Sequence, residues 1–387
     1  DKIVIATPQS EEERRFGERG TLAMLEDALF VGTNKSAYIF KFEGSHWNQT
    51  QRIETGVTSS SLTDLHVISA VQDTVLVGTE RFSTTLVLEM ESPNGWQTIA
   101  SLQEVQFNNR FGFSSTVGEG YVAVGAPTAH TDVESSCAIY VYEPGPLSQW
   151  SSTTTLFPSD RASGDRFGFS MAADKDRLVV GSLLADNDRG AAYVFKRSED
   201  GTWLETAKLT ATDLGPFSEF GHSVDLLGNR AIVGATGTGG GAAYIYTTSE
   251  AGQWSQVARL TPSIRNASAN FGQSVILTEE YAIVGSPALG PDRQGAVFIF
   301  QEQDNGDWKE IQILRPDISA GALFGSALSF SEGLLAVGAP NENDLLLGKY
   351  GAVYVFVVPE PGSLYLLLIS SAVVFYVRRL SANALGG

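Results

Sequence analysis

The sequence predicts an all-β fold, a seven-bladed β-propeller whose blades each contain four antiparallel strands. Three observations lead to this prediction. The chain repeats itself with a period of about 50 residues, which is in the range of propeller blades. In five of the repeats a Phe-Gly pair precedes a Val-Gly pair at a constant distance, and a tryptophan recurs at one place in the repeat.

The two glycine-containing pairs define the units. Phe-Gly begins at Phe16, Phe111, Phe167, Phe220, Phe271 and Phe324. Thirteen residues after each of the last five stands a valine followed by glycine, at Val124, Val180, Val233, Val284 and Val337. The same interval counted back from Val77 reaches Asp64, which identifies one more unit without its Phe-Gly pair. Because seven such units form one array, residues 1–357 are predicted to be one domain.

Each unit divides into four short strands. The residues after Phe-Gly lead through a polar turn into an apolar strand such as 334–337, as in a hairpin. A break at Gly-Ala-Pro precedes a third strand, such as 351–356, that is rich in β-branched and aromatic residues. The fourth strand starts at a tryptophan, at Trp47, Trp96, Trp150, Trp203, Trp254 or Trp308. Since Phe, Gly and Trp recur in nearly every unit, we assign them packing roles between strands and blades.

The ends of the array are expected to meet in one blade. The seventh unit has no Trp strand after Phe356, whereas residues 2–8 resemble a fourth strand such as 257–262. We therefore expect the N-terminal strand to complete the last blade, which would leave no open sheet edge. The alternative is a longer chain with more repeats upstream.

Composition excludes several classes of function. The formal net charge of −18 repels nucleic-acid phosphates. A single cysteine, Cys137, excludes an intrachain disulfide and a cysteine-cluster metal site. The histidines are too far apart in sequence to form a spaced metal pair, at His46, His66, His130 and His222. No nucleophile with a base and no catalytic carboxylate pair stands out, and the glycine run 237–241 lacks the helix that a phosphate loop needs. We expect no enzyme.

These motifs resemble the FG-GAP repeat family, which includes the ligand-binding propeller of integrin α chains and many bacterial surface proteins. The resemblance covers residues 1–357 and is most specific in blades three to seven. In the integrin-like members, an Asp-x-Asp-x-Asp-Gly loop between the first two strands holds calcium. The corresponding turns here, such as 118–120 and 331–333, are too short and too poor in carboxylates for the six to eight oxygens of a calcium site. No cofactor is predicted, although calcium stays possible.

Aspartates elsewhere in the repeats are weaker candidates for ligands. Asp186 and Asp188 lie between the second and third strands of blade four and could begin a metal site. We favour the alternative, a solvated turn before Gly190. Asp160 and Asp213 each stand seven residues before a Phe-Gly pair, as does Asp317, and we expect all three to form Asx turns.

Residues 358–387 differ from the propeller. Pro359, Glu360 and Pro361 precede the apolar segment 364–377, and Arg378 and Arg379 follow it. This order resembles the PEP-CTERM sorting signal of exosortase-containing bacteria. The resemblance implies an exosortase-like sorting enzyme that reads the Pro-Glu-Pro motif, a C-terminal transmembrane helix at 364–377, and a basic end on the cytoplasmic side. The apolar segment would span about 21 Å, less than a bilayer core, so cleavage and permanent anchoring both stay open.

The combined hypothesis is an exported, non-catalytic binding or adhesion module with an extracellular polysaccharide or protein as ligand. Its expected location is the cell surface, outer membrane or extracellular matrix of a Gram-negative bacterium, with a membrane anchor in the precursor. The loops between Gly-Ala-Pro and the third strand vary in length, so we expect the binding surface on that face. The alternatives are a polysaccharide-acting enzyme with its site in the long loops of blades three, four and seven, and a structural matrix component.

Overall fold

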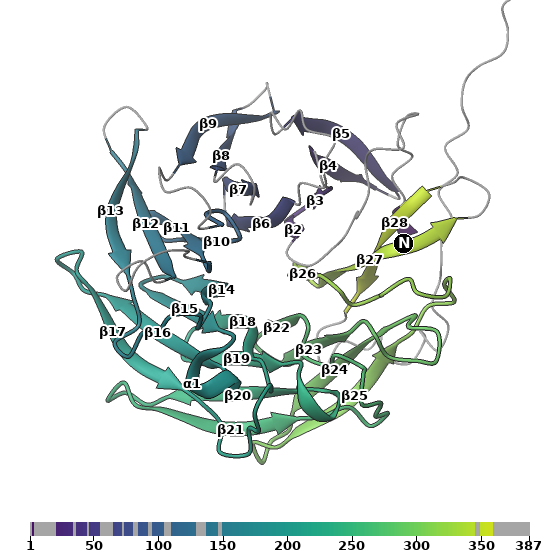
Figure 1. The fold of residues 1–387 in the computed structure, drawn as a ribbon. Coiled ribbons are helices and arrows are strands. Elements are labelled where there is room, and N and C mark those ends of the chain that lie inside the picture. Colours follow the sequence, from purple (N-terminus) through teal and green to yellow (C-terminus); the bar gives the residue numbers. More distant parts are fainter. Residues whose placement is uncertain are drawn as a thin grey trace, which may run out of the picture.

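The structure is a computed structural model, and it describes residues 2–3, 21–33, 36–44, 46–54, 65–71, 73–79, 84–91, 95–103, 110–128, 137–145, 149–344 and 349–358. The described residues form seven four-stranded sheets. The sheets are arranged as blades around a common centre (Figure 1). The predicted all-β, seven-bladed propeller with four-stranded antiparallel blades is therefore confirmed.

The first three blades follow one another along the chain. Blade one comprises β2 (Leu22–Leu25), β3 (Ala28–Gly32), β4 (Ser36–Glu43) and β5 (His46–Glu54). Blade two comprises β6 (Leu65–Val71), β7 (Thr74–Thr79), β8 (Thr84–Glu91) and β9 (Gly95–Gln103). Blade three comprises β10 (Ser114–Gly118), β11 (Tyr121–Ala126), β12 (Ala138–Pro144) and β13 (Trp150–Leu156).

Blades four to six repeat the pattern. Blade four comprises β14 (Phe167–Asp174), β15 (Arg177–Ser182), β16 (Ala191–Arg197) and β17 (Trp203–Leu209), with the short α1 (Ala185–Asp188) in its second loop. Blade five comprises β18 (Phe220–Leu227), β19 (Arg230–Ala235), β20 (Ala242–Thr248) and β21 (Trp254–Leu260), with the 3-10 turn η2 (Thr238–Gly240). Blade six comprises β22 (Val275–Leu277), β23 (Tyr281–Ser286), β24 (Ala296–Glu302) and β25 (Trp308–Leu314).

Blade seven contains the last three strands that the structure describes. It comprises β26 (Leu328–Ser331), β27 (Leu334–Asp344) and β28 (Lys349–Val357). The two-residue strand β1 (Lys2–Ile3) pairs with β28 in antiparallel register, with Lys2 opposite Tyr354. Figure 1 shows the N-terminus beside β28. That this strand closes the ring stays a prediction, taken up below.

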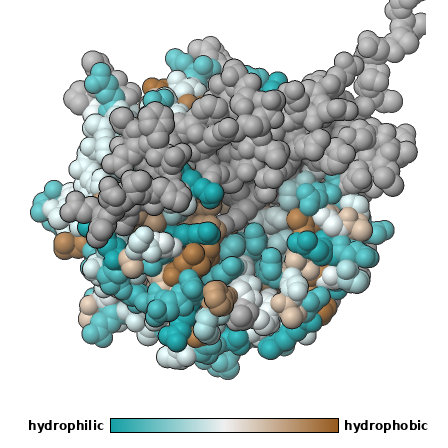
Figure 2. All heavy atoms as spheres, viewed as in Figure 1, coloured by the Kyte–Doolittle hydropathy of each residue, from teal (hydrophilic) through white to brown (hydrophobic). Residues whose placement is uncertain are grey.

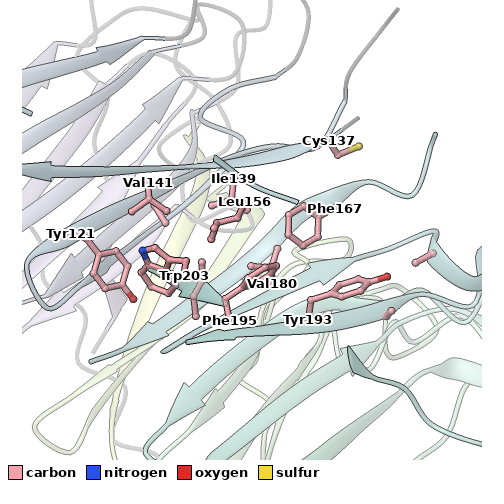
Figure 3. Packing of buried hydrophobic residues seen from close by; sticks show 14 residues of the cluster. Tyr121, Cys137, Ile139, Val141, Leu156, Phe167, Val180, Tyr193, Phe195 and Trp203 are labelled. Carbon is pink, nitrogen blue, oxygen red and sulfur yellow. The ribbon is translucent and has the colours of Figure 1, made fainter. Parts of the chain in front are cut away.

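Phe-Gly and Trp pack adjacent blades together, as their recurrence predicted. Phe167 is 1% exposed, and its ring meets that of Tyr193 edge-on at 5.7 Å. Trp203 of blade four packs against Tyr121 of blade three, with ring centroids 4.9 Å apart. Figure 3 shows these rings in one cluster with apolar side chains of both blades, such as Ile139. The main driving force for assembly of the ring is therefore burial of apolar surface between sheets.

The glycine of each Val-Gly pair allows two blades to come together. A Cβ at Gly181 would lie 2.1 Å from the carbonyl oxygen of Gly221, which follows Phe220 in the next blade. The same distance separates a Cβ at Gly234 from the carbonyl oxygen of Gly272. Because no side chain fits in that space, only glycine permits this approach of two backbones.

A serine three residues after Phe forms a second link at the same place. The Ser170 hydroxyl donates to the Gly221 carbonyl oxygen at 2.8 Å, and the Ser223 hydroxyl donates to that of Gly272 at 2.8 Å. Blades three and six have equivalent bonds, from Ser114 and Ser274. The sequence analysis missed this residue, although Phe-Gly-x-Ser recurs in four units.

Several sequence predictions fall on residues that the structure does not describe. They are the first Phe-Gly pair at Phe16, the sorting motif 359–361, the apolar segment 364–377 and the basic end at Arg378 and Arg379. Within the described ranges, no helix has the length and apolar character needed to cross a membrane. The sorting signal stays a prediction from sequence.

Candidate binding site

The loops between second and third strands share a face with the connections between blades. Antiparallel order requires this, because the second strand and the fourth strand of a blade end on the same side. In blades four and five this face contains α1, η2 and the connections 210–219 and 261–270. We call it the loop face. The surface drawn in Figure 2 is mostly hydrophilic over the described residues, with scattered hydrophobic patches.

A charged cluster lies on the loop face of blade four. The ammonium group of Lys208, at the end of β17, contacts the carboxylates of Asp160 and Asp186 at 2.6 Å each. The hydroxyl of Tyr193, on β16, donates to the other oxygen of Asp160 at 2.8 Å. The Lys208 nitrogen also stands 5.4 Å from the centre of the Tyr193 ring. The lysine is thus held by two carboxylates and an aromatic face.

These contacts shift the protonation equilibria of the cluster. Burial tends to lower the pKa of Lys208, but bonds to Asp160 and Asp186 outweigh it and the pKa is raised. Burial tends to raise the pKa of Asp160, but bonds from Lys208 and Tyr193 lower it overall. Burial also raises the pKa of Asp165, which lies close to both carboxylates. The cluster is an internal ion pair at neutral pH.

Blade five carries a related group beside an open pocket. Arg259, at the end of β21, contacts Asp213 with its Nε atom at 2.7 Å. The hydroxyl of Tyr244, on β20, donates to the same carboxylate at 3.2 Å. The adjacent pocket has a volume of ≈ 230 Å³, and its lining includes Arg259, Arg265, Asn266 and the three glycines 239–241.

A second, larger cavity of ≈ 1040 Å³ lies among the first strands of the blades, at the centre of the ring. Asp225 of β18 lines it and accepts backbone N–H bonds from Leu226 at 2.9 Å and from Leu277 of the next blade at 2.8 Å. Burial raises the pKa of Asp225 to about 6, against the opposing effect of these two bonds.

A hydroxyl, an imidazole and a carboxylate meet on the loop-face side of blade five. The Thr236 hydroxyl bonds to Glu219 and lies 3.0 Å from Nδ1 of His222. Nδ1 of His222 is also 3.5 Å from the Glu219 carboxylate. The His222 ring stands edge-on to Phe169 of blade four, with centroids 5.3 Å apart. The sequence analysis did not find this group, although Glu219 and His222 are three residues apart and Thr236 follows 14 residues later, because the three residues match no catalytic motif.

The structure separates the aspartates that the sequence analysis singled out. Asp186 binds Lys208, whereas the backbone carbonyl of Asp188 accepts a bond from Phe217. The described residues contain no group of three or more His, Cys, Asp or Glu side chains arranged to hold a metal ion. Two of the aspartates expected in Asx turns form side-chain bonds instead: Asp160 and Asp213 each bind a tyrosine and a basic residue. The Asx turn at Asp317 stays a prediction.

Two other residues of the sequence analysis have defined places. Cys137 is 5% exposed at the start of the third strand of blade three, and its thiol donates to the Pro127 carbonyl oxygen at 3.1 Å. A buried thiol of this kind acts as a small packing residue. The glycine run 237–241 forms a tight loop, because a Cβ at Gly240 or Gly241 would strike the backbone of the next connection.

Comparison with known families identifies the repeat. Residues 150–195, 203–246, 254–300 and 308–356 match the FG-GAP repeat family. The chain contains four FG-GAP repeats. Each FG-GAP repeat starts at the tryptophan of a fourth strand and ends in the third strand of the following blade, so every repeat links two blades. The resemblance to integrin α propellers stays a prediction from the sequence.

Comparison with solved structures supports the fold. A functionally unknown protein from Desulfotomaculum acetoxidans DSM 771 has a TM-score of 0.55 to this chain at 14% sequence identity, with 84% of this chain and 90% of that chain covered. At such an identity the likeness concerns the fold alone. No curated protein matches the sequence.

Proposed function

We propose that this chain is a non-catalytic binding module that takes an extracellular polysaccharide or protein on its loop face. The observation that carries the proposal is the contrast between a constant frame and variable loops. Phe-Gly, Val-Gly and the serine links repeat from blade to blade, whereas the loop-face residues differ and leave a polar pocket in blade five. A rigid scaffold with variable loops is typical of binding proteins.

The test is a binding panel on the intact chain. Immobilised protein is exposed to neutral glycans, acidic glycans and matrix proteins, and the supernatants are analysed for reaction products. Binding of one class without turnover supports the proposal. Failure of every class to bind, or product formation from a bound ligand, contradicts it.

We also propose that residues 358–387 direct export and sorting. The support is the order of the Pro-Glu-Pro motif, the apolar segment 364–377 and the basic pair Arg378–Arg379. An exosortase-like enzyme would act on this segment and leave the propeller at the cell surface or in the matrix. Deleting 358–387 should leave the propeller folded but change its cellular fraction, which immunoblotting of membrane, surface and medium fractions would measure. An unchanged distribution contradicts the proposal.

We propose further that the N-terminal strand closes blade seven. The register supports this, because Lys2 stands opposite Tyr354 as Lys208 stands opposite Tyr193 and Arg259 opposite Tyr244. Removing residues 1–8 should therefore lower the midpoint of thermal unfolding. An unchanged midpoint would contradict closure by this strand.

The alternative is an enzyme, and the Glu219–His222–Thr236 group is the observation that favours it. A hydroxyl within hydrogen-bond reach of an imidazole is the basic arrangement of nucleophilic catalysis. The panel above detects such activity through its products. Product formation that is lost in His222→Gln but kept in the control His46→Gln would establish the enzyme in place of the binding module.

A further inference from the structure

Blades four and five have equivalent groups of residues at the loop face, and the difference between them indicates the ligand of the blade-five pocket. In blades four and five, the third strand carries a tyrosine opposite a basic residue of the fourth strand, Tyr193 with Lys208 and Tyr244 with Arg259. A carboxylate from the preceding connection binds both members of each pair, Asp160 in blade four and Asp213 in blade five. The two sites are therefore built alike.

The sites differ in how their positive charge is neutralised. In blade four, α1 supplies a second carboxylate, Asp186, so that Lys208 has two anionic partners. In blade five, the shorter loop 236–241 contains no Asp or Glu. Within the described lining of the pocket, Arg259 and Arg265 stand against one carboxylate, that of Asp213. The blade-five pocket lacks the second anion that blade four carries.

The guanidinium groups of blade five retain donors for a ligand. Arg259 uses Nε for its contacts with Asp213 and with the Tyr244 oxygen. Arg265 donates from one terminal nitrogen to the Thr261 hydroxyl at 3.0 Å. Each guanidinium has five N–H donors, and a planar pair of them matches the two oxygens of a carboxylate.

We propose that this pocket binds the carboxylate of an acidic saccharide, a uronic-acid unit, in the place that the Asp186 carboxylate takes in blade four. The inference rests on the proposed binding function and names its ligand class. The carboxylate lies between Arg259 and Arg265, and the glycine loop leaves the room that the sugar needs.

The remaining lining favours a sugar over an acidic peptide. The ≈ 230 Å³ pocket is larger than a carboxylate group requires, and its wall adds the Asn266 amide and the hydroxyls of Ser218 and Thr261. Amides and hydroxyls both donate and accept, so they suit the hydroxyl groups of a saccharide ring. A peptide backbone would need a strand edge or an apolar groove, and this pocket provides neither.

Blade six lacks the charged group that blades four and five have at this position. At the equivalent register the tyrosine and basic residue are replaced by Phe298 and Ile313. Ile264 stands seven residues before Phe271, where the other two blades have an aspartate. The tyrosine, the basic residue and the aspartate are thus all absent from blade six, the next blade along the chain.

The experiment measures binding of oligogalacturonate to the full chain by isothermal titration calorimetry. Maltooligosaccharide of the same length is the neutral control, and poly-glutamate is the acidic peptide control. Arg265→Gln should weaken oligogalacturonate binding by about tenfold or more, since a hydrogen bond to a charged group is lost. Raising the salt concentration should weaken it as well.

Two further variants test the comparison with blade four directly. Gly239 has φ +82 and borders the pocket, and a Cβ there would meet nothing within 4 Å. Asp and Asn tolerate this left-handed conformation better than most residues do. Gly239→Asp would supply the missing carboxylate from within and should reduce binding by at least about tenfold. Gly239→Asn, of equal size without charge, should stay within about threefold of the parent.

The outcomes separate this inference from the proposed function. If a neutral glycan or a protein binds and all three variants bind it as well as the parent, the binding module stands and the uronate pocket is wrong. If poly-glutamate binds as tightly and is lost in the same variants, the saccharide assignment is wrong. If Gly239→Asp and Gly239→Asn behave alike, the charge argument fails. If no ligand class binds at all, the proposed function itself is contradicted.

Discussion

Asp225 should make the propeller less stable as the pH rises from 4 to 7. Its carboxyl group lines the central cavity and links blades five and six through the Leu277 N–H group. Burial raises its pKa from the ordinary value of 3.8 to about 6. A shift of about 2 pKa units corresponds to about 3 kcal/mol between the protonated and ionised forms. The fold therefore favours the neutral carboxyl group by about that amount.

The sign of the pH dependence follows from the direction of this shift. The folded chain holds the proton more tightly than the unfolded chain does, so stability from this group is complete below pH 3.8. It is lost progressively as the pH rises towards about 6 and does not return above that value. Asp225→Asn keeps an oxygen acceptor for the Leu277 N–H group but cannot ionise.

The assay is urea denaturation of the parent and of Asp225→Asn at several pH values. The difference between their free energies of unfolding isolates this group, because other titrating residues cancel. We expect the variant to gain about 3 kcal/mol on the parent between pH 4 and pH 7. Asp304→Asn, the same change at an exposed position, is the matched control. Parallel curves for the parent and Asp225→Asn would refute the reasoning.

Three further substitutions test the contacts between blades by chemical denaturation. Gly234→Ala should lower the free energy of unfolding by about 3 kcal/mol, because its Cβ would lie 2.1 Å from a backbone oxygen of blade six. Gly252→Ala, in an open turn, should lower it by about 1 kcal/mol. Equal losses would contradict the close-approach argument. Ser170→Ala should lower the free energy of unfolding by about 1–2 kcal/mol, because the hydrogen bond to blade five is lost. An unchanged free energy of unfolding would mean that this bond does not stabilise the fold. Phe271→Ala, at a fully buried ring between Phe298 and Phe300, should cost about 3–5 kcal/mol, and a smaller loss would mean that the blades collapse onto the cavity.

The constant half of the repeat was predictable because its residues act locally or on the nearest blade. Phe220 and Gly234, fourteen residues apart, recur in register and so reveal the two contacts that define a blade interface. The serine at Ser223 recurs in the same way, and aligning four units would have found it. Its role was missed because serine is common in turns and carries little information by itself.

The loop-face groups were not predictable in the same way. Asp160 was expected to form an Asx turn, since its partner Lys208 lies in the fourth strand of the next blade and no short motif connects them. Asp186 reaches the same lysine from a third segment. Such a site depends on three chain segments meeting at one end of a blade, and they meet only in the folded blade.

The sequence by itself determined the repeat, its seven units, its four-stranded blades and the residues that pack them. It could do so because blade packing is repeated, and each copy confirms the others. Only the tertiary structure showed which basic side chains of the loop face lack a second carboxylate partner. Blade four neutralises its lysine with a carboxylate from its own loop, whereas the glycine loop of blade five leaves its arginines facing a pocket. The difference depends on which side chains of three chain segments come into contact, and those segments meet only in the folded blades.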